Sequence, residues 1–274
     1  MSREIDQLPV PAAIRQMKVI VASPSRSGTL GLYRAMQILG YNSYHLYECV
    51  AVHGVQHMKI FKEAITAQYY PSSGVKRITR ADCDKWLADY DCLVEIPSYL
   101  GVDVIKAYAN DPDVKFILTE RSPEKWAKSV RNSVGKVVAM SGAFPFNILK
   151  YFDAFLWHFF DFNVLVYRAI GGENEELLYQ YYTEYIEKVK TTLPADRLCL
   201  IRLEDGIDWE TICPFLGVPV PQVAYPGRNE PEKFQAMVQE ALQPKVTAAM
   251  MRMGAVVVPV LGILGWASKS YFWK

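Results

Sequence analysis

Short apolar runs that alternate with helix-like segments constrain the fold of this chain more than any other feature. Four runs are continuous: MKVIVA (17–22), DCLVEIP (91–97), VKFILTE (114–120) and RLCLIRL (197–203), and NSYHLY (42–47) is a shorter fifth. Strands that are apolar on both faces are typical of parallel sheets covered by helices on both sides. Their alternation with helical segments predicts the same arrangement. We therefore expect an α/β fold with three αβα layers around a central parallel sheet.

The composition divides the chain into an N-terminal extension (1–14), an α/β domain (15–245) and a hydrophobic C-terminal tail (246–274). The run from Met253 to Ala267 carries no charge, and Lys269 and three aromatic residues follow it. A membrane-spanning helix needs about 20 apolar residues. Aromatic residues and lysines are typical of a membrane interface. Two interpretations stay open: a tail that associates with a membrane, and a segment that packs on the domain.

Bulk charge and cysteine usage narrow the class of protein. The net charge is +1, which gives no argument for nucleic acid as a partner. The five cysteines form no CxxC pair, and no signal peptide opens the chain. We therefore expect a reducing, cytoplasmic compartment, with the tail allowing membrane association. The oligomeric state, including a homodimer, stays open.

The segment SPSRSGT (23–29) lies between the first predicted strand and a predicted helix over 29–39. Gly28 allows close backbone approach, and the amides of Ser27, Gly28 and Thr29 lie at a helix N-terminus, where an anion is favoured. Arg26 adds a positive charge. The segment is not the pattern GxxxxGK[ST]. The alternative is an ordinary capped turn with an incidental arginine.

A second phosphate site is predicted at the end of the strand VKFILTE. Arg121 follows this strand, and Ser129 comes eight residues later, two turns into the next helix. In open parallel sheets, ligands bind beyond the carboxyl ends of the strands. The two side chains can therefore close on one phosphate near the first loop.

Together these motifs resemble the sulfotransferase family, and more closely its P-loop branch in fungi and bacteria. PSRSGT resembles the family's 5′-phosphosulfate loop, and RSPEKWAKS (121–129) resembles its 3′-phosphate motif. YHL (44–46) and FLGVPVP (215–221) follow that branch in the same order. The resemblance covers roughly residues 15–235. It implies a P-loop nucleotide-binding type of fold, the donor 3′-phosphoadenosine 5′-phosphosulfate and no metal.

The resemblance also implies roles for residues of this chain. The 5′-phosphosulfate would be held by one loop, made of Ser25, Arg26, Ser27, Gly28, Thr29 and Leu30. Arg121 and Ser129 would hold the 3′-phosphate. The chain departs from the family in two places: Ser25 is one residue more than the usual loop has, and the C-terminal GxxGxxK segment is absent. YPGRNEP (225–231) lies near that position, so we expect Arg228 or Asn229 to substitute.

Sulfuryl transfer needs a base for the acceptor hydroxyl and a cation for the leaving oxygen. Arg26 suits the second role by charge alone, because its pKa is too high for acid–base work. Candidate bases are His45 and Glu95; the alternatives are a buried structural histidine and an ion pair of Glu95 with Arg26 or Arg121. Aromatic-rich residues 45–75 and 140–170 suit a small hydrophobic or aromatic acceptor.

Two other functions stay open beside sulfation. One is a sulfotransferase-fold enzyme of secondary metabolism that no longer sulfates. The other is a membrane-tethered nucleotide-binding protein.

Overall fold

A five-stranded parallel sheet forms the centre of the molecule. The computed structural model describes residues 2–227 and 231–272. The strands are β1 (Val19–Val21), β2 (Ser43–Tyr44), β3 (Cys92–Val94), β4 (Lys115–Glu120) and β5 (Leu198–Arg202). Their order is β2-β3-β1-β4-β5, and every neighbouring pair is parallel. All five strands lie where the apolar runs predict them.

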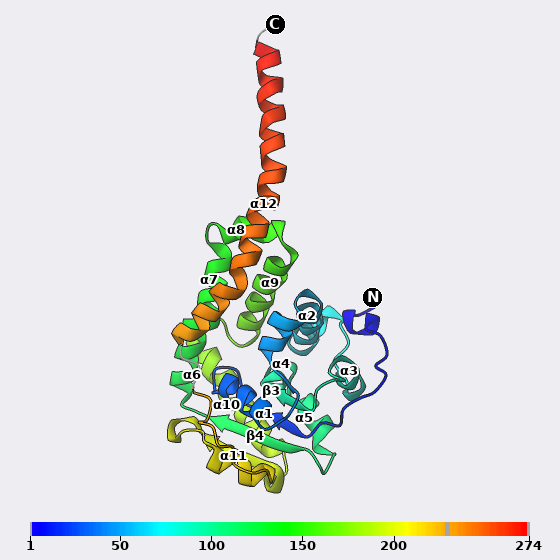
Figure 1. The fold of residues 1–274 in the computed structure, drawn as a ribbon, viewed down its shortest axis with the longest axis vertical. Helices are drawn as coiled ribbons and strands as arrows, with labels where there is room; N and C mark the ends of the chain where they lie inside the picture. Colours follow the sequence, from blue (N-terminus) through cyan, green and yellow to red (C-terminus); the bar gives the residue numbers. More distant parts are fainter. Residues whose placement is uncertain (1, 228–230, 273–274) are drawn as a thin grey trace.

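Helices cover both faces of this sheet, so the expected three-layer architecture is confirmed (Figure 1). Val19 and Val21 face a cluster formed with α1 (Thr29–Ile38) and α11 (Trp209–Leu216). The intervening Ile20 faces the larger cluster on the opposite side. This alternation follows from the two-residue period of a strand, and both faces are apolar because both are covered.

The larger cluster is built from helices that follow β2, β3 and β4. These are α2 (Val55–Tyr69), α3 (Arg80–Trp86), α4 (Ile96–Leu100), α5 (Val102–Ala109), α6 (Pro123–Val130), α7 (Lys136–Gly142), α8 (Phe146–Leu149), α9 (Ala154–Ala169) and α10 (Glu175–Thr192). Short 3-10 and π-helical segments complete the described chain: η1 (Glu4–Gln7), η2 (Glu48–Val52), η3 (Pro71–Ser73), η4 (Arg131–Gly135), η5 (Lys150–Phe152), η6 (Ala195–Arg197) and η7 (Leu203–Asp205).

Local sequence explains several helix boundaries. The Ser122 hydroxyl accepts a hydrogen bond from the Lys125 amide, and Pro123 occupies the first turn of the helix. Helix α6 therefore begins at the position that the predicted N-cap, Ser122, indicates. The helix expected over 98–110 is instead two helices separated at Gly101, which has φ 85°. This conformation is rare for a residue with a Cβ, so the break between the helices favours glycine. A Cβ there would also lie 2.5 Å from Nε2 of Gln68, the flexible end of a side chain in α2.

The two predicted terminal segments differ in how they meet the domain. The N-terminal extension packs on it, because Ile5 is buried and Arg3 forms an ion pair with Asp82 in α3 at 2.8 Å. The predicted boundary at 245/246 lies inside one long helix, α12 (Pro231–Phe272), which runs through Pro244 and Pro259.

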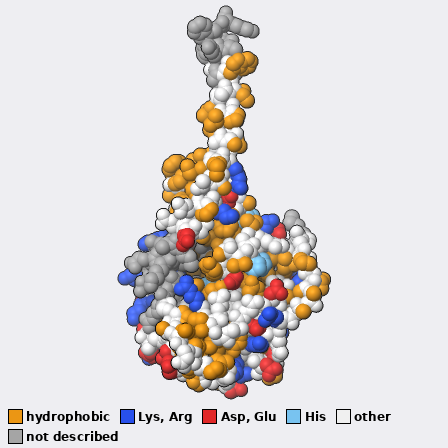
Figure 2. Space-filling view, viewed as in Figure 1, with side chains coloured by type: hydrophobic (Ala, Val, Ile, Leu, Met, Phe, Trp, Pro, Cys, Tyr) orange, Lys and Arg blue, Asp and Glu red, His pale blue; other side chains and the backbone are white. Residues whose placement is uncertain are grey.

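The first half of α12 packs on the domain and the second half leaves it. Leu242 and Ala249 are buried, and Val246 and Met253 pack against the core. Beyond Met253 the helix projects from the globular part, with apolar side chains along it (Figures 1 and 2). Within the described residues, one segment is long and apolar enough to cross a membrane, Val238–Leu264, and almost none of its most apolar stretch is buried.

Candidate functional site

The loop after β1 is held by hydrogen bonds to its backbone carbonyls. Four carbonyls between residues 22 and 27 accept hydrogen bonds from side chains. Three of the donors lie in β4, α6 and α10, and the fourth, Arg121, directly follows β4. The pairs are Tyr185 to Ala22 (2.7 Å), Trp126 to Ser25 (2.8 Å), Arg121 to Arg26 (2.7 Å) and Thr119 to Ser27 (2.6 Å). These donors satisfy the acceptors of the loop. Its amides, at the N-terminus of α1, are the groups that an anion can use.

Backbone strain is concentrated in this region. Among the described residues, Arg26 (φ 69°) and Glu95 (φ 62°) are the non-glycine residues with positive φ, and both lie in the site. Such conformations cost free energy and persist only where the surrounding contacts impose them, which is common at functional sites. Arg26 is separated by one residue from Gly28, which also has a positive φ of 84°.

The structure brings Arg26, Arg121 and Ser129 together. Arg26 Nε donates to Ser129 Oγ at 3.3 Å, and Arg121 Nη1 donates to the Arg26 carbonyl. Because β1 and β4 are neighbours, the loops that follow them meet at one edge of the sheet. The Arg121 amide also donates to the Tyr182 hydroxyl at 2.8 Å, which fixes the backbone of this arginine. The two predicted phosphate sites are therefore adjacent.

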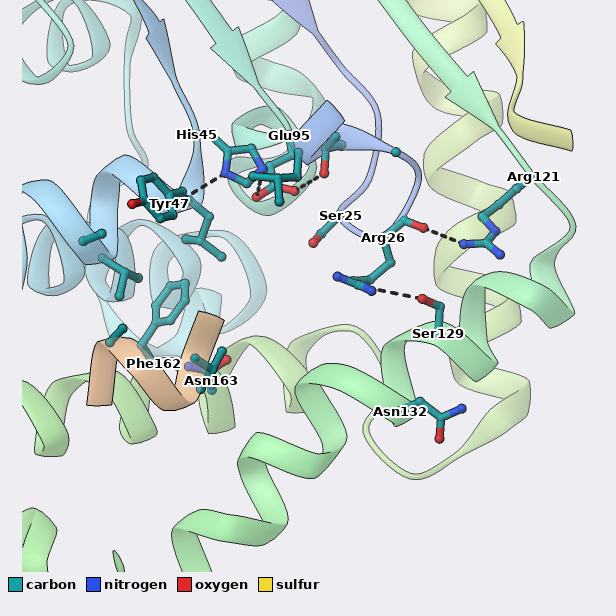
Figure 3. A pocket seen from close by; sticks show the side chains of 18 of the residues that line it. Ser25, Arg26, His45, Tyr47, Glu95, Arg121, Ser129, Asn132, Phe162 and Asn163 are labelled. Carbon is teal, nitrogen blue, oxygen red and sulfur yellow. Dashed lines mark hydrogen bonds and ion pairs between the residues drawn. The ribbon is translucent and has the colours of Figure 1, made fainter. Parts of the chain in front are cut away.

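A cavity of about 470 Å³ lies against these loops (Figure 3). One part of its wall is polar and cationic, and it contains most of the residues predicted from the sequence. These are Ser25, Arg26, Gly28, Thr29, Leu30, His45, Glu95, Arg121 and Ser129. Ser27 is fully buried and is not in this wall, so its side chain is less accessible than we expect from the motif.

Three further polar residues in the wall escape the sequence prediction. Lys125 and Lys128 in α6, and Asn132 in η4, line the cavity together with Ser129. Their spacing of three or four residues places them on one side of the helical segment. In the sequence, the positions of these three residues relative to Ser129 are the signal that could have predicted them. With Arg26 and Arg121 they make a donor set for a ligand with several negative charges.

The remaining wall of the cavity is apolar. It comes from the segment after β2, from α9 and from the first turns of α12. The side chains are Leu46, Tyr47, Val50, Ala51, Phe159, Phe162, Val238 and Ala241. Most of them lie in the two aromatic-rich regions from which we expect acceptor contacts, whereas α12 is an addition that only the structure reveals. An apolar pocket beside a few polar groups is typical of a small-molecule site.

Glu95 and His45 lie beside the loop that follows β1 (Figure 3). The Thr29 hydroxyl donates to Glu95 Oε2 at 2.6 Å, and His45 Nε2 lies 3.0 Å from Glu95 Oε1 without the alignment of a hydrogen bond. The Tyr47 amide donates to His45 Nδ1 at 2.9 Å. Because Nδ1 is an acceptor there, the proton of a neutral ring is on Nε2, the nitrogen that faces the carboxylate.

Burial and hydrogen bonding act in opposite directions on Glu95. Burial raises the pKa of this carboxyl, but the neighbouring His45 and the hydroxyls of Thr29 and Ser25 outweigh it, so the pKa is below its ordinary value. Burial also lowers the pKa of Arg26, against the charge of Glu95. Glu95 is charged at neutral pH because its pKa is lowered. Arg26 is also charged, because the ordinary pKa of arginine lies far above neutral pH.

The predicted contacts from Arg228 and Asn229 lie outside the described residues. The residues just before them are placed: a Cβ on Gly31 in α1 would lie 3.3 Å from the Pro226 carbonyl and 3.5 Å from that of Gly227. The YPG segment therefore packs over the first turns of α1. For metals, the described residues contain no group of three or more histidine, cysteine or acidic side chains that could hold an ion.

Comparisons with known proteins identify the family of this chain. The sulfotransferase domain family matches residues 18–234. A protein of Aspergillus versicolor, "Ava biosynthesis cluster protein M", is 32% identical over 221 residues, which is 77% of this chain and 80% of that protein. A sulfotransferase structure from Alicyclobacillus acidocaldarius aligns over 89% of this chain and 96% of its own, with 12% identity and a TM-score of 0.43. Because the family matches most of the chain, the protein belongs to the sulfotransferase family.

Proposed function

We propose that this enzyme transfers a sulfuryl group from 3′-phosphoadenosine 5′-phosphosulfate to a hydroxyl of a small hydrophobic or aromatic acceptor. The observation that carries the proposal is one cavity with a cationic wall and an apolar wall, with Glu95 beside the phosphate loop. The cationic wall fits a bis-phosphorylated donor, because four cationic side chains line the cavity there: Arg26, Arg121, Lys125 and Lys128. The apolar wall fits the acceptor.

Each residue then has a role in the transfer. Arg121 and Ser129 hold the 3′-phosphate, while Arg26 and the loop amides hold the 5′-phosphosulfate. The acceptor oxygen bonds to sulfur as the bond from sulfur to the bridging oxygen breaks. Arg26 stabilises the charge that develops on the leaving phosphate.

We propose Glu95 as the base that takes the acceptor proton. It is buried and anionic, and it lines the cavity. His45 has Nδ1 occupied by the Tyr47 amide and its proton on Nε2, so it suits the positioning of Glu95 better than proton removal. A positioned general base contributes about 10²- to 10⁴-fold to a rate. Glu95→Gln should therefore lower kcat by about that factor with donor affinity retained, whereas His45→Asn should lower it less.

Calorimetry with adenosine 3′,5′-bisphosphate tests the donor site. Arg121→Ala should abolish tight binding, whereas Lys106→Ala, an exposed cation of α5, should leave it unchanged. Transfer of radiolabelled sulfur to a panel of lipophilic alcohols tests the reaction. Absence of nucleotide binding at millimolar concentration would refute the proposal.

A second candidate is an enzyme of secondary metabolism that binds the nucleotide without sulfation. The name of the Aspergillus relative places that protein in a biosynthesis cluster, and the additional Ser25 alters the loop that contacts the transferred group. Tight nucleotide binding with no labelled product from any acceptor would favour this candidate over the first.

We also infer that α12 attaches the enzyme to a membrane. Residues 254–272 of this helix extend for about 28 Å, close to the roughly 30 Å hydrocarbon core of a bilayer. Apolar side chains such as Val258, Leu261 and Ile263 are exposed around it. The full chain should stay with membranes after alkaline carbonate extraction, and a chain ending at Met253 should not. Release of the full chain would refute the attachment.

A further inference from the structure

Exposed apolar side chains surround the point where α12 leaves the domain. We call residues 143–152 and 250–252 the collar. Its two parts are in contact, because α8 and η5 pack on α12. Arg252 Nη1 donates to the Phe152 carbonyl at 3.2 Å and forms an ion pair with Asp153. Arg252 therefore joins the two parts of the collar at the last turn of α12 that packs on the domain.

The collar exposes several large apolar side chains. Phe144 is 80% exposed, and Tyr151 and Met251 are each 66% exposed. Ile148 and Met250 are also exposed. Clustered exposed apolar residues of this kind mark an interaction surface rather than random scatter. The collar thus needs an occupant.

Aromatic and basic side chains in the collar indicate a lipid interface. The ring of Tyr151 packs on Trp157 with centroids 5.3 Å apart, and Lys150 Nζ lies 5.7 Å from the Tyr151 ring centroid. Tyrosine and tryptophan rings prefer the headgroup level of a bilayer. Lys150 Nζ donates to the Ser141 carbonyl at 3.1 Å, and an ammonium group has further hydrogens to donate to a phosphate.

The charge pattern points to an anionic surface. Residues 136–152 contain no acidic residue, and neither do residues 241–274. Both stretches contain cations, including Lys150 and Lys245. The adjacent acidic residue, Asp153, is buried and paired with Arg252. Basic residues next to a membrane segment are attracted to anionic lipid headgroups by about 1 kcal/mol each.

We propose that the collar is a second membrane contact, which lies in the headgroup layer of an anionic bilayer and holds the catalytic domain in one orientation. This inference rests on the membrane attachment of α12 and is independent of the reaction. It has a consequence for the site, because Ala241 in the cavity wall is on the same helix as Met253. Twelve residues of helix separate them, about 18 Å, so the collar fixes the distance of the cavity from the membrane.

Headgroup quenching of a fluorescent label tests the collar. Phe144→Cys carries the label in the collar, and Val220→Cys carries it on an exposed site after α11, at the opposite end of the domain (Figure 1). Both variants of the full chain carry Cys199→Ser, because Cys199 is half-buried and the other four cysteines are buried. The vesicles contain phosphatidylcholine and a headgroup spin-labelled lipid, with or without phosphatidylserine.

The label at position 144 should lose fluorescence in vesicles with phosphatidylserine, and the label at 220 should not. Removing phosphatidylserine should reduce the loss at 144. Equal signals at both positions in a chain that resists carbonate extraction would overturn the collar but leave the anchor intact. A chain that carbonate releases would overturn the anchor, and the collar with it. A label at 144 that is shielded yet unquenched would show a protein partner or a second copy, which also overturns the proposal.

Discussion

Replacement of Gly28 by alanine should damage the phosphate loop through steric contact as well as backbone strain. Gly28 has φ 84°, and an added Cβ would lie 2.9 Å from Leu203 Cδ1 and 3.0 Å from Ile207 Cδ1. A left-handed conformation costs an L-residue about 1–2 kcal/mol, and an overpacked site adds about 1–3 kcal/mol. The expected loss in the free energy of unfolding is therefore about 2–5 kcal/mol.

Gly40→Ala is a matched control for this substitution. Gly40 has nearly the same backbone conformation, φ 88°, but a Cβ there would meet nothing within 4 Å. Its expected loss is the strain alone, about 1–2 kcal/mol. Gly40 also lies at the far end of α1 from the loop, so its variant should bind nucleotide as the wild type does.

Urea unfolding with and without adenosine 3′,5′-bisphosphate measures both effects. The affinity of Gly28→Ala should fall by at least about tenfold, a difference of roughly 1.4 kcal/mol, because Leu203 and the loop must move apart around the cavity. Equal destabilisation in the two glycine variants would show that the contact with Leu203 is unimportant. Unchanged affinity in Gly28→Ala would refute the role of the loop in anion binding.

Three further predictions concern buried polar groups. Burial and the charge of the neighbouring His53 lower the pKa of His57 from 6.5 to about 3. Because the unfolded chain binds the proton first, the free energy of unfolding should fall by about 2 kcal/mol from pH 7 to pH 5. Urea titrations of His57→Gln should lack this component. Thr29→Val removes a hydrogen-bond donor to the Glu95 carboxylate. It should lower the free energy of unfolding by about 1–3 kcal/mol and lower kcat, and Thr29→Ser should restore both. A wild-type kcat in the valine variant would contradict this. Trp126→Phe removes the bond to the loop carbonyl of residue 25 and should weaken nucleotide binding measured by calorimetry more than it changes the melting temperature.

Much of the fold follows from local pattern. The strands are predicted because continuous apolar runs of this length suit a sheet covered on both faces, as the two clusters around Val19 and Ile20 show. Helix α6 begins at its predicted cap because Ser122 and Pro123 act within one turn of the chain. The division at Gly101 is not predictable from local pattern, since a glycine can either continue a helix or adopt the φ of 85° that Gly101 has.

The site is divided in the same way between sequence and tertiary structure. By itself the sequence predicts a phosphate loop with Arg121 and Ser129 near it, because each prediction depends on spacing along one strand–helix unit. Only the tertiary structure decided that Thr29 and His45 converge on Glu95, and that α12 closes the apolar wall with Val238. These contacts join residues far apart in the chain, and their geometry depends on how strands and helices pack together.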